Sequence, residues 1–220
     1  DSRGGGHGSG RLTALLVAAA GLARPILDRH AITAAAHLQA VGEVEAPAFD
    51  IDAATMEAAC LASPLRTAAP AWETRFAERI EAARRQRDSV GGLVAWRADG
   101  LPAGLGSPFF ASLESSLAAL LFSVPAVVGV EFGAGFAAAR STGSASNDAY
   151  RRVDGRVTPV TNRAGGVLGG RSTGAPFTGR VAVKPASSIA QPQATVDLSR
   201  GQEATVEVTG RHDPCIAVRA

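Results

Sequence analysis

The spacing of apolar residues predicts helices in several parts of the chain. Residues 11–27 are rich in Ala and Leu, with Pro25 near the end, and residues 52–62 form a shorter helical segment that begins with an Asp. Between residues 70 and 87, apolar side chains recur every three or four positions, whereas arginines mostly occupy the other face. This last stripe predicts a core-facing surface rather than a cofactor site, and it consists of Trp72, Phe76, Ile80 and Ala83.

Other stretches alternate apolar and polar residues or are rich in β-branched residues, which is typical of strands. A Ser-Pro pair at 107–108 predicts the start of a helix that runs to Leu121 and is apolar enough to be buried on more than one face. Because helices and strands interleave without a regular βαβ order, the pattern favours the α+β class. The expected strands are residues 31–44 as a pair, 92–97, 124–132, 180–184 and 194–211, the last with a turn at 199–201.

The stretch 141–170 is polar and rich in glycine. It is too long to be an idle connection in a compact domain, so it is either disordered or a functional lid. We expect a mobile active-site loop there.

Composition restricts the function classes. At 220 residues and 46% hydrophobic residues, the chain is long enough to bury a core, as one large domain or two closely packed ones. Its longest apolar run ends at Arg24 and Pro25, short of the roughly 18 residues that a membrane span needs, so we expect no membrane partner. A net charge of +2 gives no reason to expect nucleic-acid binding. Two cysteines without a CxxC spacing indicate a reducing, cytoplasmic location.

The kind of basic residue is more informative than the net charge. Of the 22 basic residues, 21 are Arg, and Lys184 is the single Lys. A compact ammonium is not replaceable by a planar guanidinium at a tight site, which makes Lys184 a candidate functional residue. Ser187 and Ser188 follow closely, and their hydroxyls suit either a phosphate or a helix cap.

A glycine-rich loop at residues 3–11 precedes the first helix. Its five glycines allow backbone N–H groups to approach a ligand, and the following helix adds the positive end of its dipole, which predicts an anion site. A flexible end is the alternative. The loop is not a Walker A motif, because Arg11 stands at the Lys position and Leu12 at the hydroxyl position, which argues against a P-loop nucleotide-binding protein.

Near the end of the chain, Arg211, His212 and Asp213 bring together a cation, an imidazole and a carboxylate. Asp213 is suited to proton transfer, although a salt-bridged turn explains the same triplet. Cys215 is interpreted as a buried thiol, and His30 and His37 as surface or packed residues, because neither histidine has a second ligand at metal spacing.

Seven motifs, in order along nearly the whole chain, resemble those of the chorismate synthase family. They are RGGGHGSGR at 3–11, GLPAGLG at 100–106, VVGVEFG at 127–133, GSASND at 143–148, NRAGGVLGG at 162–170, KPASSI at 184–189 and GRHDPC at 210–215.

The resemblance implies a carbon–oxygen lyase that converts 5-enolpyruvylshikimate 3-phosphate to chorismate and phosphate by 1,4-elimination, with reduced FMN as cofactor. It also implies a β-α-β sandwich, a single domain over residues 1–220, and a homotetramer for the full-length protein. Asp213 matches an aspartate proposed to take part in proton transfer, and Arg11 is a candidate substrate contact. The implied FMN contacts are His7, Gly8, Ser9, Pro125, Ala126, Gly169, Lys184, Pro185, Ala186, Ser187, Ser188 and Arg211.

The resemblance further implies an internal fragment. The family's Gly-Glu-Ser-His-Gly motif and a later His belong upstream of Asp1, and its last helix continues past Ala220. We therefore expect no chorismate synthase activity from the 220 residues by themselves. The alternatives are a non-catalytic module or remnant that binds flavin or phosphate, and another FMN-dependent lyase on the same scaffold.

Overall fold

The computed structural model describes residues 9–153, 155–210 and 213–219. Its helices are α1 Thr13–Arg29, α2 Ala53–Ala62, α3 Pro70–Arg85, α4 Leu113–Leu121 and α5 Gly143–Ser146, with 3-10 turns η2 Gly10–Leu12, η3 Phe109–Ala111, η4 Gly135–Arg140 and η5 Ile216–Arg219. Its strands are β1 Thr33–Val41, β2 Val44–Glu45, β3 Gly92–Asp99, β4 Val127–Phe132, β5 Tyr150–Val153, β6 Arg156–Pro159, β7 Val167–Leu168, β8 Arg171–Ser172, β9 Phe177–Val183, β10 Gln193–Asp197 and β11 Gln202–Val206. The predicted α+β class is confirmed.

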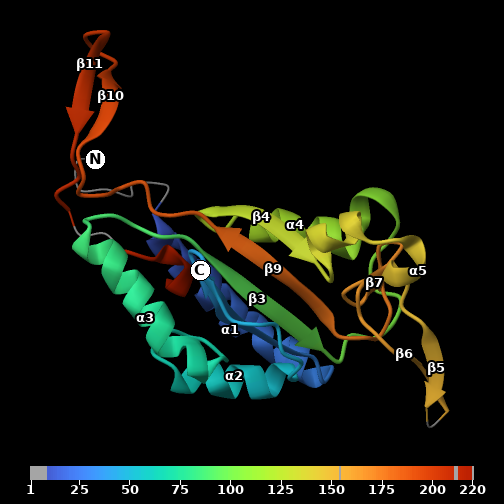
Figure 1. Cartoon of the computed structure of the whole chain (residues 1–220). Coiled ribbons are helices and arrows are strands. Elements are labelled where there is room, and N and C mark those ends of the chain that lie inside the picture. Colours follow the sequence, from blue (N-terminus) through green and yellow to red (C-terminus); the bar gives the residue numbers. More distant parts are fainter. Residues whose placement is uncertain (1–8, 154, 211–212, 220) are drawn as a thin grey trace.

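Five strands form the central antiparallel sheet, in the order β2-β1-β3-β9-β4 (Figure 1). On β9, every second residue from Phe177 to Val183 is buried, as expected for a strand with one face on the core. The register places Leu38, Val94 and Val181 in one row across β1, β3 and β9, and all three are buried. This row forms the middle of the core.

Helix α3 packs on this face of the sheet. Phe76 and Ala83 are buried in the core cluster, and Trp72 and Ile80 pack against its edge, so the apolar stripe predicted for residues 70–87 is core. Helix α2 starts at an N-cap, Asp52, whose carboxylate accepts a hydrogen bond from the Thr55 N–H at 2.9 Å. Both helices therefore agree with their predicted ranges.

Helix α4 differs from its prediction. It begins only after Ser112, whose hydroxyl accepts a hydrogen bond from the Ser115 N–H at 3.0 Å, because Phe109 adopts a left-handed φ of 62° and the chain first makes a 3-10 turn. None of its residues is buried, and Phe110 before it is fully exposed, so the expectation of burial on more than one face is wrong for this chain. Helix α1 likewise has no buried residue and continues through Pro25 to Arg29.

Two hairpins extend from opposite ends of the sheet (Figure 1). Strands β10 and β11 form a hairpin that projects from the end of the molecule where β9 finishes, and the turn predicted at 199–201 joins them. Strands β5 and β6 extend at the other end, within the segment 141–170. This segment contains short helical and strand elements, and its mobility stays a prediction.

No helix in the described part of the chain is long and apolar enough to cross a membrane.

Candidate functional site

Several of the predicted site residues lie outside the described part of the chain. These are His7, Gly8 and Arg211, together with the side chain of Arg11, whose backbone belongs to η2. Ser9 and Gly10 are described. A Cβ atom built at Gly10 would lie 2.8 Å from Cδ1 of Ile216, so the beginning of the described chain packs against η5, near Asp213 in sequence.

Two predicted segments meet at one end of the central sheet. Strand β4 begins at Val127 and the antiparallel strand β9 ends at Val183, and these two residues are register partners. The flanking residues are therefore neighbours, and the Lys184 N–H donates a hydrogen bond to the Ala126 carbonyl at 2.8 Å. Ala126 has a left-handed φ of 73°, a conformation that costs an alanine energy and that marks functional sites in many proteins.

Three hydrogen-bond donors near this point lack partners among the described residues. They are the Lys184 ammonium, which is exposed, and the hydroxyls of Ser187 and Ser188. An ammonium and two hydroxyls within five residues form a donor set suited to a phosphate group.

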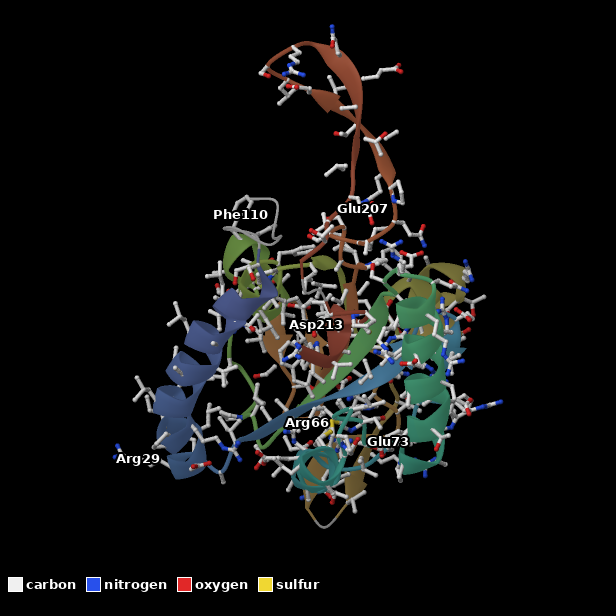
Figure 2. All side chains as sticks on the ribbon, turned by 90° about the vertical axis from the view of Figure 1, so that its left-hand side faces the viewer. Arg29, Arg66, Glu73, Phe110, Glu207 and Asp213 are labelled. Atoms are coloured by element: carbon white, nitrogen blue, oxygen red, sulfur yellow. The ribbon has the colours of Figure 1, made fainter. Side chains whose placement is uncertain are left out.

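Asp213 lies beside the same end of the sheet. The carbonyl of the next residue, Pro214, accepts a hydrogen bond from the Val90 N–H at 2.7 Å. The Asp213 carboxylate is half-buried and forms an ion pair with Nε of Arg219 at 2.9 Å, which orients it. Figure 2 shows Asp213 between α1 and α3. Cys215 is buried, and burial raises the pKa of its thiol, which agrees with its interpretation as an unreactive core residue.

Gly169 lies apart from the other predicted site residues. A Cβ atom at its neighbour Gly170 would meet Ser112 and Ser107, and the Leu113 N–H donates to the Gly170 carbonyl at 3.0 Å, so this turn lies at the start of α4. In Figure 1 this region, near β7, is at the opposite end of β9 from Lys184. The structure therefore brings Ala126, Lys184 and Asp213 to one end of the sheet and places Gly169 at the other.

Asp148 organises the loop that leads to Gly169, a role that sequence reasoning missed. Its carboxylate accepts hydrogen bonds from the Thr161 hydroxyl at 2.6 Å and from the N–H groups of Arg163 at 2.8 Å and Ala164 at 2.9 Å. Partial burial pushes the pKa of Asp148 upward, but these hydrogen bonds outweigh it and hold the pKa below its ordinary value. The one sequence feature that could have indicated this role is the position of Asp148 at the end of the GSASND motif, residues 143–148.

The described residues contain no group of three His, Cys, Asp or Glu side chains placed to hold a metal ion. Two shallow surface hollows lie elsewhere, one on the outer face of α3 and one on the β10–β11 hairpin, and no predicted site residue lines either of them.

Comparison with known proteins relates the chain to one family. The family model described as chorismate synthase matches residues 1–220. Over 220 residues, the chain is 44% identical to the chorismate synthases of Pyrococcus abyssi and Korarchaeum cryptofilum and 45% identical to that of Thermococcus gammatolerans. All of this chain is covered in each case, but only 60% of the relative, so the chain spans about three fifths of the length of these relatives.

A solved structure agrees with the sequence comparisons. It is described as a crystal structure of chorismate synthase, and it superimposes with a TM-score of 0.75 at 28% identity. The superposition covers 81% of this chain and 57% of that one.

Proposed function

This chain belongs to the chorismate synthase family, and on that premise we propose that it forms part of an enzyme that eliminates phosphate from 5-enolpyruvylshikimate 3-phosphate to give chorismate, with reduced FMN as cofactor. The observation that carries the proposal is the donor set at the end of β9: the Lys184 ammonium and the hydroxyls of Ser187 and Ser188 are free of partners among the described residues. Unpaired donors of this kind fit the phosphate of a cofactor or substrate.

The proposed roles follow from the positions of the residues. Lys184 and the two serines hold an anionic group, and the segment Pro125–Ala126 forms the adjoining wall, because the Ala126 carbonyl binds the Lys184 N–H. Reduced FMN, when bound, supplies a transient electron that helps phosphate leave. In the elimination a C–O bond to phosphate breaks and a ring carbon loses a proton, and Asp213 takes part in moving that proton while Arg219 orients its carboxylate.

Flavin titration of Lys184→Ala tests the binding part of the proposal. We expect Lys184→Ala to weaken FMN binding by about tenfold or more, because a charge-assisted hydrogen bond to phosphate is lost. The matched control is Arg200→Ala, which removes one positive charge at the tip of the β10–β11 hairpin, where Arg200 pairs with Asp197. We expect this control to bind FMN as the unmodified chain does, as measured by flavin fluorescence.

Three outcomes separate the hypotheses. Saturable binding that Lys184→Ala weakens and Arg200→Ala does not would support a flavin site at the end of β9. Equal weakening by both variants would indicate non-specific attraction of an anion to a basic protein. No FMN binding by the unmodified chain would favour a folded remnant without a flavin site.

The proposal assigns turnover to a complete family member. Since the chain spans 60% of the length of its relatives, we expect the 220 residues alone to release no phosphate from 5-enolpyruvylshikimate 3-phosphate in the presence of reduced FMN. Steady release of phosphate and chorismate by this polypeptide would contradict that expectation. We further propose that the complete protein is a homotetramer in a reducing cytoplasm.

A further inference from the structure

The connector between α3 and β3, residues 86–91, contacts several segments that are distant in sequence. The Gln86 carbonyl accepts a hydrogen bond from Nε2 of Gln191 at 2.7 Å, and Arg87 pairs with Glu207 at the base of the β10–β11 hairpin. Ser89 and Val90 reach the candidate site itself. The Ser89 hydroxyl donates to the Ala186 carbonyl at 2.6 Å, and the Val90 N–H donates to the Pro214 carbonyl, next to Asp213.

Close packing accompanies these hydrogen bonds. A Cβ atom at Gly91 would lie 2.6 Å from the Val183 carbonyl oxygen and 3.1 Å from Cδ of Pro185, so only a glycine lets the connector approach this closely. The segment 184–188 is therefore held on one side by Ala126, the residue before β4, and on the other by the connector.

The bond from Ser89 has a directional consequence. The carbonyl of Ala186 and the N–H of Ser187 belong to one planar, trans peptide unit, so they point in opposite directions. Because Ser89 fixes that carbonyl toward the connector, the Ser187 N–H points away from the connector. Among the described residues, this N–H has no hydrogen-bond partner.

We propose that Ser89 is a positioning residue for the anion-binding segment. Through its hydrogen bond to the Ala186 carbonyl, it fixes the peptide plane that directs the Ser187 N–H, and with it the start of the Ser187–Ser188 pair, toward the phosphate of the ligand. The inference rests on the proposed function, since that function identifies the ligand as a phosphate-bearing cofactor. It adds to the site a residue 97 positions upstream of Ala186.

The test compares Ser89→Ala with Ser123→Ala. Ser123 is a matched control, because its hydroxyl also donates to a backbone carbonyl, that of Leu120, at 2.6 Å, but beyond the end of α4. FMN is titrated into each full 220-residue variant by fluorescence, and the thermal unfolding midpoint and the amide hydrogen exchange of residues 184–193 are measured alongside. Replacement of one hydrogen bond predicts binding about fivefold weaker for Ser89→Ala.

The inference is supported if Ser89→Ala weakens FMN binding and speeds exchange in residues 184–193, while its unfolding midpoint matches that of Ser123→Ala. Ser89→Thr, which keeps the hydroxyl, is then expected to restore binding. Equal FMN affinity in the two alanine variants overturns the inference and leaves the proposed function standing. If the unmodified chain binds no FMN, the proposed function fails, and the exchange data decide the inference: faster exchange in Ser89→Ala supports the positioning of this segment, and unchanged exchange overturns it.

Discussion

At the scale of single residues, His37 is a titratable group placed in the core. It is 5% exposed, its Nδ1 lies 3.1 Å from the Leu38 carbonyl oxygen, and its ring contacts that of Phe49. The carbonyl can only accept, so Nδ1 carries a proton and donates it, which both the neutral Nδ1–H tautomer and the imidazolium can do. Burial lowers the pKa of His37 below its ordinary value of 6.5, although the hydrogen bond to Leu38 opposes this effect.

This placement predicts a loss of stability in mildly acidic solution. Because the unfolded chain takes up the proton at a higher pH than the folded chain, the contribution of His37 is complete above about pH 6.5 and falls as the pH drops toward the lowered folded pKa. We expect the urea midpoint to decrease from pH 7.5 to pH 5.5 less steeply in His37→Gln than in the unmodified chain. His30→Gln, at an exposed position, serves as the control for replacing a histidine. Identical slopes in His37→Gln and the unmodified chain would contradict the prediction.

How far single residues could be predicted depended on how local their partners are. Lys184 was predicted because it is the single lysine, and Asp213 because its neighbours suggested proton chemistry; their site roles stay proposals. Ser89 could not be predicted, because its partner is 97 positions away and its bond is to a backbone carbonyl, which leaves no side-chain pattern. Arg219 is only six positions from Asp213, but its ion pair depends on the 3-10 turn η5 between them, which no sequence pattern indicated.

At the scale of elements, Asp148 joins the two ends of the chain segment 148–164, which lies outside the central sheet. Its three hydrogen bonds close the chain around the β5–β6 hairpin, so that residues 161–164 return to the point where the hairpin began. The carboxylate is the single acceptor group for all three donors. Every one of these bonds is lost or weakened when the charge is removed.

We therefore expect Asp148→Asn to reduce the free energy of unfolding by about 1–2 kcal/mol, because an amide N–H then faces a backbone N–H. Asp197→Asn is the matched control, since Asp197 binds Ser199 in an exposed turn, and we expect it to cost less than about 0.5 kcal/mol. The pKa of Asp148 is lowered from its ordinary 3.8, so its contribution is present above that pH and is lost as the pH falls below it. Urea unfolding at pH 7 and pH 3 measures both effects, and equal losses in the two variants at pH 7 would refute the assignment.

Element boundaries were predictable where a cap or a period fixed them. Asp52 caps α2, and the 3.6-residue period defines α3. For residues 107–121 the predicted helix start was wrong. The Ser-Pro pair at 107–108 resembles a helix start, but Ser112 is the N-cap of α4. Apolar content also did not predict burial, since Phe110 is fully exposed in this chain.

At the scale of the whole molecule, the β10–β11 hairpin stands clear of the core. None of its residues is buried, and it touches the body only near its base, where Gln193 bonds the Ser187 carbonyl (Figure 1). We expect replacement of residues 195–204 by Asn-Gly, which joins the register partners Ala194 and Thr205 by a two-residue turn, to change the thermal unfolding midpoint by less than about 4 °C.

Phe76→Ala is the positive control for this measurement. Phe76 is fully buried, and we expect its truncation to cost about 3–5 kcal/mol. If the shortened hairpin lowered the midpoint as much as Phe76→Ala does, the hairpin would be part of the cooperative core. Circular dichroism measures both melts.

The class of the fold followed from the interleaved helices and strands, but the order of strands did not. The central pair, β3 with β9, joins residues 92–98 to 177–183, and no turn between them signals the pairing. Nothing in the local sequence of β9 identifies its neighbours, because antiparallel pairing depends on which apolar rows meet across the sheet.

The late position of β9 also bears on synthesis of the chain at the ribosome. Strand β4 ends at Phe132, and in the described sheet its partner is β9, which is complete only at Val183. At a synthesis rate of about 5–20 residues per second, β4 and one edge of β3 stay unpaired on the order of seconds until β9 has been made. During this interval the backbone N–H and C=O groups along one edge of each strand have no partner. Such unpaired edges can pair wrongly with other strands, and they are one reason why nascent chains need chaperones.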